Sequence, residues 1–287
     1  MFFHELKKKI KFRLRNMRHR LSEHLFREFM LKRNGLEKRA NEIEILALGP
    51  SHGTRGFNAN LIEKSFNFCC VDQDLYTIHW LFDKYIDSLT NLKKIVFFFC
   101  FPAPGHELCK TSSVKNTALS HYVFGVPYDV DWLGQWRKAA QHRLKKFDDS
   151  DIDYTTFSGY IPEEKNEKAG DMTAAFRCSH HLRENKRNNK QMHHLFEMYE
   201  VCKKKGIKMY MVLAPVRSDY IEELDKTGLS DDEIYRDMFP WAKENNIPVL
   251  NCLRSRDFEW DDFDDTDHLN EKGATKLTKK IIPFIQD

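Results

Sequence analysis

The sequence predicts an α/β fold: a three-layer α/β/α sandwich around a mostly parallel five-stranded sheet, flavodoxin-like in type. Short apolar runs alternate along the chain with amphipathic stretches of helical length, a pattern typical of parallel strands joined by right-handed crossovers. Several of the apolar runs end at Gly or Pro, which close strands. A hydrophobic content of 41% over 287 residues is enough for one large core.

The predicted strands are the short apolar runs. The clearest of them contains Ile95 to Phe99 without interruption, and Pro102 closes it. Another contains Cys69 and Cys70, which are expected to be buried thiols rather than metal ligands. In chain order, the strands are expected at residues 43–48, 65–71, 94–101, 208–214 and 248–252.

Helical patterns connect these strands, and one long segment interrupts the alternation. Residues 105–187 are aromatic in their first half and polar in their second. A stretch of this length is expected to be an insertion in the domain 41–287, with a helix or two and a lid-like part over the site. The connecting helices are expected at about 72–90, 130–146, 188–206, 231–246 and 271–286.

The first 40 residues form a basic, amphipathic segment. They hold thirteen Lys and Arg against four Glu, although the whole chain has a net charge of only +3. A long helix is expected over 4–34. It can pack on the domain, contact an anionic membrane surface through residues 1–34, or bind a partner. No nucleic-acid motif accompanies the basic residues, so no nucleic acid is expected as a partner.

The expected location is the cytoplasm. No apolar stretch approaches the ~20 residues of a membrane span, and no signal-peptide core follows the basic start. Seven cysteines without a repeated spacing fit a reducing compartment. If the basic segment binds lipid, the protein would lie peripherally at the inner membrane face.

Ser51 is the candidate nucleophile. It follows the first predicted strand and Gly49-Pro50, so a strand-turn-helix would expose it at the carboxyl edge of the sheet. The N-terminus of the following helix offers N–H donors and a dipole that favours an anion. Ser51 can therefore be a nucleophile whose own amide holds an oxyanion, or an ordinary helix cap.

A candidate general base, His268, lies near the other end of the chain, and Asp265 precedes it by three residues. His268 would take the Ser51 proton, and Asp265 would orient the imidazole. Asp264 or Asp267 could replace Asp265, or the acidic stretch could be a solvated turn before a helix. An open α/β sheet can bring such distant segments together at the carboxyl ends of its strands. The helix cap would be Asn270 or Asp267.

Together, these residues resemble the SGNH, or GDSL-like, hydrolase superfamily over roughly residues 42–286. Gly49-x-Ser51 is similar to the first block of that family, with Pro50 where Asp or Asn is usual. Asp265-x-x-His268 is similar to the last block. The ending Leu269-Asn270 with Gly273-Ala274 resembles that of bacterial polysaccharide-modifying members.

The resemblance implies a serine esterase or O-acyltransferase that acts on an acylated glycan or another acyl donor. Ser51, His268 and Asp265 would be its catalytic triad. The oxyanion would be held by the amides of Ser51 and Cys69, the latter standing at the glycine of the family's second block. The third-block Asn is missing from 101–106. Its replacement could be Asn58, Asn67 or His106, and its loss motivates an alternative: a catalytically weak glycan-binding or scaffold protein.

Other polar residues are expected near the same edge. The candidates for substrate binding are His52, Arg55, Asp72 and Arg217. The stretch Asp72-Gln73-Asp74 can contact sugar hydroxyls, but a cap on the next helix is the favoured interpretation. His52 and Arg55 can lie in solvent. The adjacent histidines at 180–181 and 193–194 point in different directions, so neither pair is expected to chelate a metal by itself. No metal and no cofactor are predicted.

Overall fold

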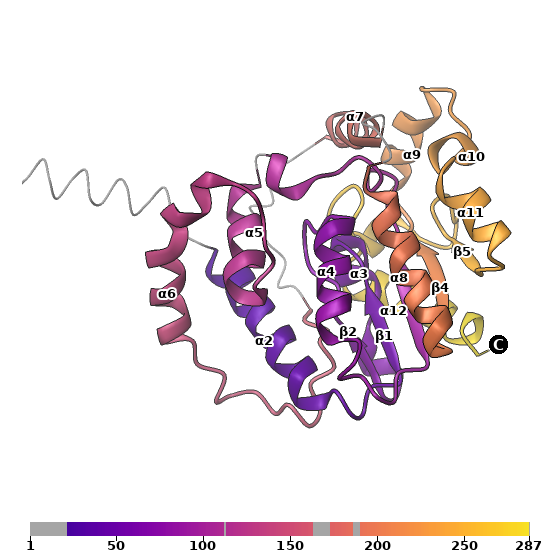
Figure 1. Cartoon of the computed structure of the whole chain (residues 1–287). Coiled ribbons are helices and arrows are strands. Elements are labelled where there is room, and N and C mark those ends of the chain that lie inside the picture. Colours follow the sequence, from indigo (N-terminus) through magenta and orange to yellow (C-terminus); the bar gives the residue numbers. More distant parts are fainter. Residues whose placement is uncertain (1–21, 112, 163–172, 186–189, 287) are drawn as a thin grey trace, which may run out of the picture.

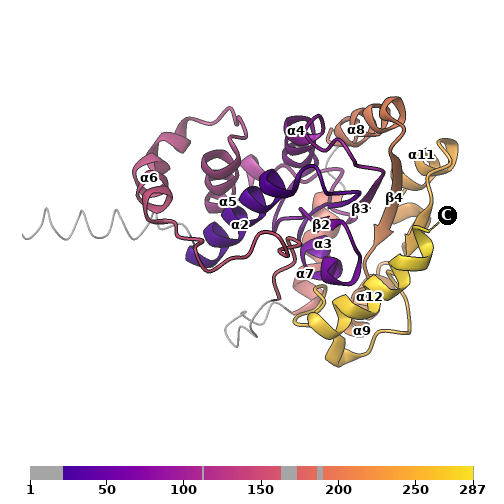
Figure 2. The same ribbon diagram turned by 90° about the horizontal axis from the view of Figure 1, so that it is seen from below.

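A computed structural model describes residues 22–111, 113–162, 173–185 and 190–286. Five parallel strands form one sheet in the order β2-β1-β3-β4-β5, with helices on both faces (Figures 1 and 2). This confirms the three-layer α/β/α class and the flavodoxin-like order. The strands are β1 (Ile45–Leu48), β2 (Ser65–Asn67), β3 (Lys94–Phe98), β4 (Lys208–Leu213) and β5 (Val249–Asn251).

Every predicted strand is present, but each is shorter than its apolar run. β2 shows the physical reason most clearly. It was expected to continue to residue 71, yet it ends at Asn67, whose side-chain oxygen accepts the amide of Cys69 at 3.0 Å. Phe68, Cys69 and Cys70 remain buried beyond Asn67, and the amides of Phe68 and Cys70 still donate to the carbonyls of Ala47 and Gly49. The regular strand therefore ends at Asn67, while backbone hydrogen bonds to the β1 segment continue to Cys70.

Alternate residues of β3 face two separate cores. Ile95 and Phe97 pack in the larger core, and Val96 and Phe98 pack in the smaller one. The helices that contribute to the larger core include α2 (Glu23–Arg39), α4 (Leu75–Tyr85), α8 (Met192–Lys205) and α11 (Met238–Glu244). Helix α12 (Glu271–Phe284) covers the smaller core, beside α3 (Ser51–Gly56).

Helix α2 is the described part of the basic N-terminal segment, and it continues to Arg39 instead of ending at 34. Gly35 lies inside it because a Cβ there would come within 2.7 Å of the Phe157 ring and 3.1 Å of the Phe66 ring. The apolar face of α2 is buried in the larger core, so this part packs on the domain. Residues 1–21, which carry much of the predicted membrane contact, lie outside the described residues.

The predicted insertion is divided between two regions of the fold. Near α2 lie α5 (Val114–Leu119) and a π-helical turn (Ser120–Phe124). A 3₁₀ turn (Asp131–Trp136) and α6 (Arg137–Lys146) follow. Helix α7 (Ala174–Asn185) instead packs against α9 (Ser218–Asp225).

The remaining helical segments are short. The helix expected at 231–246 is divided into α10 (Asp231–Ile234), which Ser230 and Glu233 cap reciprocally, and α11. Short 3₁₀ turns occupy Ala59–Leu61, Leu108–Lys110 and Trp260–Asp262. Within the described ranges, no helix combines the length and the apolar character that crossing a membrane requires.

Candidate active site

The backbone between β1 and α3 places Ser51 at the carboxyl edge of the sheet. Gly49 makes the turn with a φ of +145°, a region that favours glycine. A Cβ at Gly49 would lie 2.6 Å from the carbonyl oxygen of Phe98. Only a residue without a side chain therefore lets the backbone approach β3 this closely. Pro50 precedes the first turn of α3, and Ser51 is the first residue of that helix.

A continuous hydrogen-bonded chain joins Ser51 to the last loop. Its hydroxyl oxygen lies 2.8 Å from Nε2 of His268. On the other side of the ring, Nδ1 of His268 lies 2.8 Å from Oδ2 of Asp265. The structure therefore brings together the three side chains that the sequence analysis selected as catalytic, from opposite ends of the domain.

The loop that carries Asp265 and His268 is held as a narrow turn. An antiparallel bridge joins Phe263 to Leu269. Within it, Oδ1 of Asp265 accepts the amides of Asp267 and His268 at 3.0 and 2.8 Å. Asn270 then caps α12 by accepting the amide of Gly273 at 3.1 Å. Of the two residues proposed as the cap, Asn270 therefore caps the helix, and the side chain of Asp267 has other partners.

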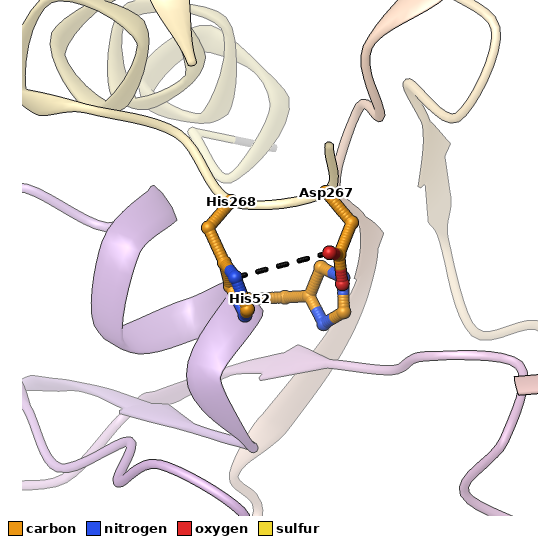
Figure 3. A group of neighbouring side chains, drawn as sticks. All are labelled: His52, Asp267 and His268. Carbon is orange, nitrogen blue, oxygen red and sulfur yellow. Dashed lines mark ion pairs between the residues drawn. The ribbon is translucent and has the colours of Figure 1, made fainter. Parts of the chain in front are cut away.

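Asp267 is a buried carboxylate beside this chain, with 1% of its side chain exposed. Arg177 donates through Nε to both of its oxygens, at 2.9 and 3.2 Å. Nε2 of His52 lies 3.4 Å from Oδ2 of Asp267, and Nδ1 of His268 lies 3.9 Å from Oδ1. Figure 3 shows the Asp267 carboxylate next to the ring of His52. The carboxylate is thus surrounded by cationic or protonatable groups.

These contacts fix the direction of the pKa shifts. Burial favours the neutral form of His268, but the negative charges of Asp267 and Asp265 outweigh it, and the pKa of His268 is raised. Burial would raise the pKa of Asp265, yet the hydrogen bond with His268 lowers it. Burial also opposes charge on His52, whose pKa is nevertheless raised by Asp267. The pKa of Asp267 lies well below its usual range because the charges around it outweigh its burial.

Helix α7 supplies two residues that the sequence analysis did not place at this site: Arg177, and His181, which it considered only as half of an adjacent histidine pair. Nε2 of His181 lies 4.0 Å from Asp267, and its Nδ1 lies 2.8 Å from the Tyr220 hydroxyl. Burial lowers the pKa of His181 to about 3, so this ring is neutral. The spacing of four between Arg177 and His181 places both on one helix face, a signal that would have been visible if 174–185 had been predicted as a helix.

Two of the predicted oxyanion donors are already engaged. The Cys69 amide donates to Oδ1 of Asn67, at 3.0 Å. The Asn67 side-chain amide donates to the carbonyls of Gly53 and Phe57, at 3.0 and 2.7 Å. Both Asn67 and Cys69 are fully buried. Contrary to the expectation, this arrangement offers no N–H from either residue to a ligand, because Asn67 uses its whole amide group to fix the turn after β2.

The other proposed replacements for the third-block Asn have partners of different kinds. Asn58 uses its acceptor, because its Oδ1 accepts the amide of Asn60 at 3.2 Å. Nε2 of His106 lies 3.5 Å from Oδ1 of Asp72. The Ser51 amide differs, because it donates to no carbonyl of the backbone that the structure describes.

The predicted substrate-binding residues lie at the carboxyl edge with intramolecular partners. Nη1 of Arg55 lies 3.4 Å from Oδ2 of Asp264. Arg217 donates to both oxygens of Asp219, at 2.8 Å each, and its guanidinium stacks 3.8 Å from the centroid of the Trp260 ring. The Arg217 amide also donates to the carbonyl of Thr266 at 2.9 Å. Arg55 and Arg217 therefore both contact the segment that carries His268.

Asp72 lies with a different set of residues. Its Oδ2 accepts the side-chain amide of Asn116 at 3.1 Å, and its other oxygen faces His106. The cap of α4 that was expected from the stretch Asp72-Gln73-Asp74 is made by Asp74, whose Oδ1 accepts the Thr77 amide at 2.8 Å.

One atom each from His52, Asp267 and His268 lies within 4.8 Å of the others, as metal ligands do. His268, however, uses Nε2 toward Ser51 and Nδ1 toward Asp265. With both ring nitrogens engaged, His268 has no free lone pair for an ion, so the geometry fits proton transfer better than metal binding.

Comparisons with known proteins identify fold neighbours only. No family model and no curated protein matches the chain. Among solved structures, it is similar to a provisionally described acylhydrolase from Bacteroides fragilis, with 11% identity over 85% of this chain and 86% of that chain, and a TM-score of 0.42. A Streptococcus pneumoniae protein, provisionally described as a platelet activating factor, has 11% identity, coverages of 91% and 94%, and a TM-score of 0.43. A GDSL-like lipase from Bacteroides thetaiotaomicron has 9% identity, coverages of 89% and 97%, and a TM-score of 0.41.

Proposed function

We propose that this protein is a serine enzyme of the SGNH type that cleaves esters, with Ser51 as nucleophile, His268 as general base and Asp265 as the group that orients His268. The observation that carries the proposal is the unbroken chain of contacts from the Ser51 hydroxyl through both ring nitrogens of His268 to the Asp265 carboxylate, each at 2.8 Å. A hydroxyl is a weak nucleophile unless a base so placed takes its proton.

The reaction follows from these contacts. The Ser51 oxygen attacks the acyl carbonyl carbon while its proton passes to Nε2 of His268. The ester C–O bond then breaks, and His268 returns the proton to the leaving alkoxide, which leaves an acyl group on Ser51. In the second half, His268 takes a proton from the acceptor, which is water or a sugar hydroxyl, as the acceptor oxygen attacks the acyl carbon. The bond between the acyl carbon and the Ser51 oxygen then breaks, and His268 returns the proton to that oxygen. Asp265 stays ionised throughout and keeps the Nδ1 proton of His268 in place.

The donor available for the developing oxyanion is the amide of Ser51, since it donates to no described backbone carbonyl. The amides of Asn67 and Cys69 are excluded from this role by their own hydrogen bonds. Because removing one oxyanion donor typically costs ~100–1000-fold in kcat, we expect the free protein to turn over simple esters slowly.

We propose an acylated glycan as the acyl donor or acceptor. Trp260 supports this, because the residue is 58% exposed and its ring stacks on Arg217, next to the segment that carries His268. An aromatic face with polar groups at its edge suits a ligand that is apolar on one side and rich in hydroxyls on the other. Water and a sugar hydroxyl can both resolve the same acyl-enzyme, so hydrolysis and acyl transfer share this site.

A fluorophosphonate probe tests the nucleophile directly, because it reacts with an activated serine without needing the natural substrate. We expect one adduct per chain in intact-mass spectra, lost in Ser51→Ala and retained in Ser88→Ala, an exposed control. Folded wild-type protein that takes no label, or label that persists in Ser51→Ala, would contradict the proposal. Incubating an acetyl ester with and without free sugars, and counting acetylated sugar against acetate, then separates transfer from hydrolysis.

A binding module without efficient catalysis is the second candidate. The observation that favours it is the closed arrangement of Asn67 and Cys69 where oxyanion donors were expected. In that case, the protein would bind acylated oligosaccharides with equal affinity in the wild type and in Ser51→Ala, and neither would react with the probe.

We also propose that the basic residues before α2 contact an anionic membrane surface. Residues 1–21 contain eight Lys and Arg and one Glu, and each basic residue near such a surface contributes about 1 kcal/mol. Sedimentation with vesicles containing anionic lipid should remove the protein from solution at low salt and release it at high salt. Equal sedimentation with neutral vesicles would contradict this.

A further inference from the structure

A group of potential metal ligands lies between α4 and α8, helices that lie side by side (Figures 1 and 2). His79 comes from α4, whereas His194 and Glu197 come from α8. Nδ1 of His79 lies 3.0 Å from Nδ1 of His194 and 3.5 Å from Oε2 of Glu197. One donor atom from each of the three lies within 4.8 Å of the others.

The second nitrogen of His79 is held by a carboxylate. Nε2 of His79 lies 3.3 Å from Oδ2 of Asp83, one turn later on α4. This contact favours a proton on Nε2 and leaves the lone pair of Nδ1 directed toward His194 and Glu197. A carboxylate on the outer nitrogen of a ligating histidine is the usual way in which proteins set the tautomer and raise the basicity of a metal ligand.

The distances suit a small tetrahedral ion. An ion with bonds of 2.0–2.1 Å and tetrahedral angles holds its ligand atoms about 3.3 Å apart. The contacts of 3.0 and 3.5 Å lie on either side of that value. Without an ion, the two imidazoles can share a hydrogen bond in which His194 is the donor. That arrangement, however, gives no role to Glu197 at the same nitrogen of His79.

We propose that His79, His194 and Glu197 bind a divalent transition-metal ion of the Zn²⁺ class. Two imidazoles and one carboxylate prefer such an ion to Mg²⁺ or Ca²⁺, which take oxygen ligands. The side chains of His79 and Glu197 are 14% and 61% exposed, so an ion reaches the site from solvent and keeps water as its fourth ligand. The bound ion would cross-link α4 and α8, which both pack in the larger core. The pair 193–194 was not expected to chelate by itself, and the further histidine comes from a helix more than 100 residues earlier in the chain.

The test uses full-length protein freed of metal with a chelator, titrated with Zn²⁺, Co²⁺ and Mg²⁺. We expect tight binding of Zn²⁺, a visible absorption band with Co²⁺, and no binding of Mg²⁺. At 100 times Kd, Zn²⁺ should raise Tm by roughly 4–8 °C. His194→Ala should abolish the high-affinity site, Asp83→Asn should weaken it about 10–100-fold, and His142→Ala, an exposed histidine on α6, should leave it unchanged.

Glu197→Gln guards against loss of folding, because this side chain is largely exposed and its replacement keeps the size. It should retain the metal-free Tm and lose most of the Zn²⁺-dependent rise. The proposal is overturned if wild type and His194→Ala bind Zn²⁺ equally. It is also overturned if the site disappears in His52→Ala while it survives in His194→Ala, since that would assign the ion to the group around Asp267.

Discussion

Asp265 holds His268 at two points: its Oδ2 lies 2.8 Å from the ring Nδ1, and its Oδ1 accepts the backbone amide of the same residue, also at 2.8 Å. Ring and backbone are therefore oriented by one carboxylate. Asp267, the neighbouring candidate, lies 3.9 Å from that nitrogen and is engaged by Arg177. The geometry thus separates two aspartates that the sequence left as alternatives: one directs the imidazole, and the other acts on it through charge.

This separation predicts different losses on neutralising each aspartate. Asp265→Asn removes the acceptor for Nδ1–H and permits the wrong tautomer, so kcat/KM for a soluble ester should fall about 10³–10⁴-fold. Asp267→Asn keeps the Ser51–His268–Asp265 chain, so its loss should be smaller. Steady-state kinetics on both variants, with Asp261→Asn as an exposed control from the same segment, measures this. If kcat/KM falls further in Asp267→Asn than in Asp265→Asn, Asp267 and not Asp265 orients His268, and the assignment made here is wrong.

The pH dependence of kcat/KM provides a second prediction. His268 must be neutral to accept the Ser51 proton, so the rate falls as pH drops through its pKa. Although burial opposes it, the charges of Asp267 and Asp265 raise that pKa, so the acid limb should lie above the ~6.5 of free histidine. Asp267→Asn removes the strongest of the raising charges and should move the limb to lower pH. The pH of the acid limb should not change in Asp261→Asn. If it does not change in Asp267→Asn either, Asp267 does not raise the pKa of His268.

The pair between Arg177 and Asp267 predicts a stability effect that couples α7 to the site. Arg177→Gln leaves a buried carboxylate without its main cation. Because the Arg177 side chain is 20% exposed, we expect less than the ~3–5 kcal/mol that breaking a fully buried pair costs, about 2–3 kcal/mol in the free energy of unfolding. Asp267→Asn in the same chain removes the uncompensated charge, so the double variant should recover part of the loss. Urea unfolding of the double-mutant cycle measures the coupling, and strictly additive losses would show that the pair contributes nothing.

The fold and the central contacts were accessible from sequence because they depend on strong local signals. Apolar runs ending in Gly or Pro identified the strands, and the position after Gly49 identified Ser51. A short polar block placed His268 and Asp265 in one loop. In an open parallel sheet, the carboxyl ends of the strands share one edge, so local positions were sufficient to predict that Ser51 and His268 meet.

The residues that the sequence analysis missed depend on long-range geometry. Arg177 lies in a polar stretch with little apolar periodicity, so nothing local predicted α7 or its approach to Asp267. Cys69 was expected to donate an amide to a ligand, but the acceptor is the side chain of Asn67, two residues earlier. A motif specifies which residue is at a position, whereas only coordinates show whether its hydrogen bonds are already used.

A buried lysine connects helix α2 to the turn after β2, and it predicts a last stability effect. Lys32 of α2 is fully buried, lies 3.4 Å from Oε1 of Glu28, and donates to the carbonyl of Cys69. Lys32→Met would leave the Glu28 carboxylate buried without a cation, which typically costs about 3–5 kcal/mol. Replacing Glu28 by Met as well removes that charge, so Lys32→Met/Glu28→Met should be markedly more stable than Lys32→Met alone.

The matched control is Lys226→Met, which removes the cation of an exposed pair with Glu223, three residues earlier at the end of α9. An exposed pair contributes about 0–1 kcal/mol, so its loss should barely change the unfolding midpoint in urea. If Lys32→Met is as mild as Lys226→Met, the buried ammonium does not fasten α2 to the turn after β2. Removing Glu28 eliminates the isolated carboxylate but does not restore the hydrogen bond to Cys69. If the double variant is no more stable than Lys32→Met, the loss of stability in Lys32→Met therefore arises from the lost hydrogen bond and not from the isolated carboxylate.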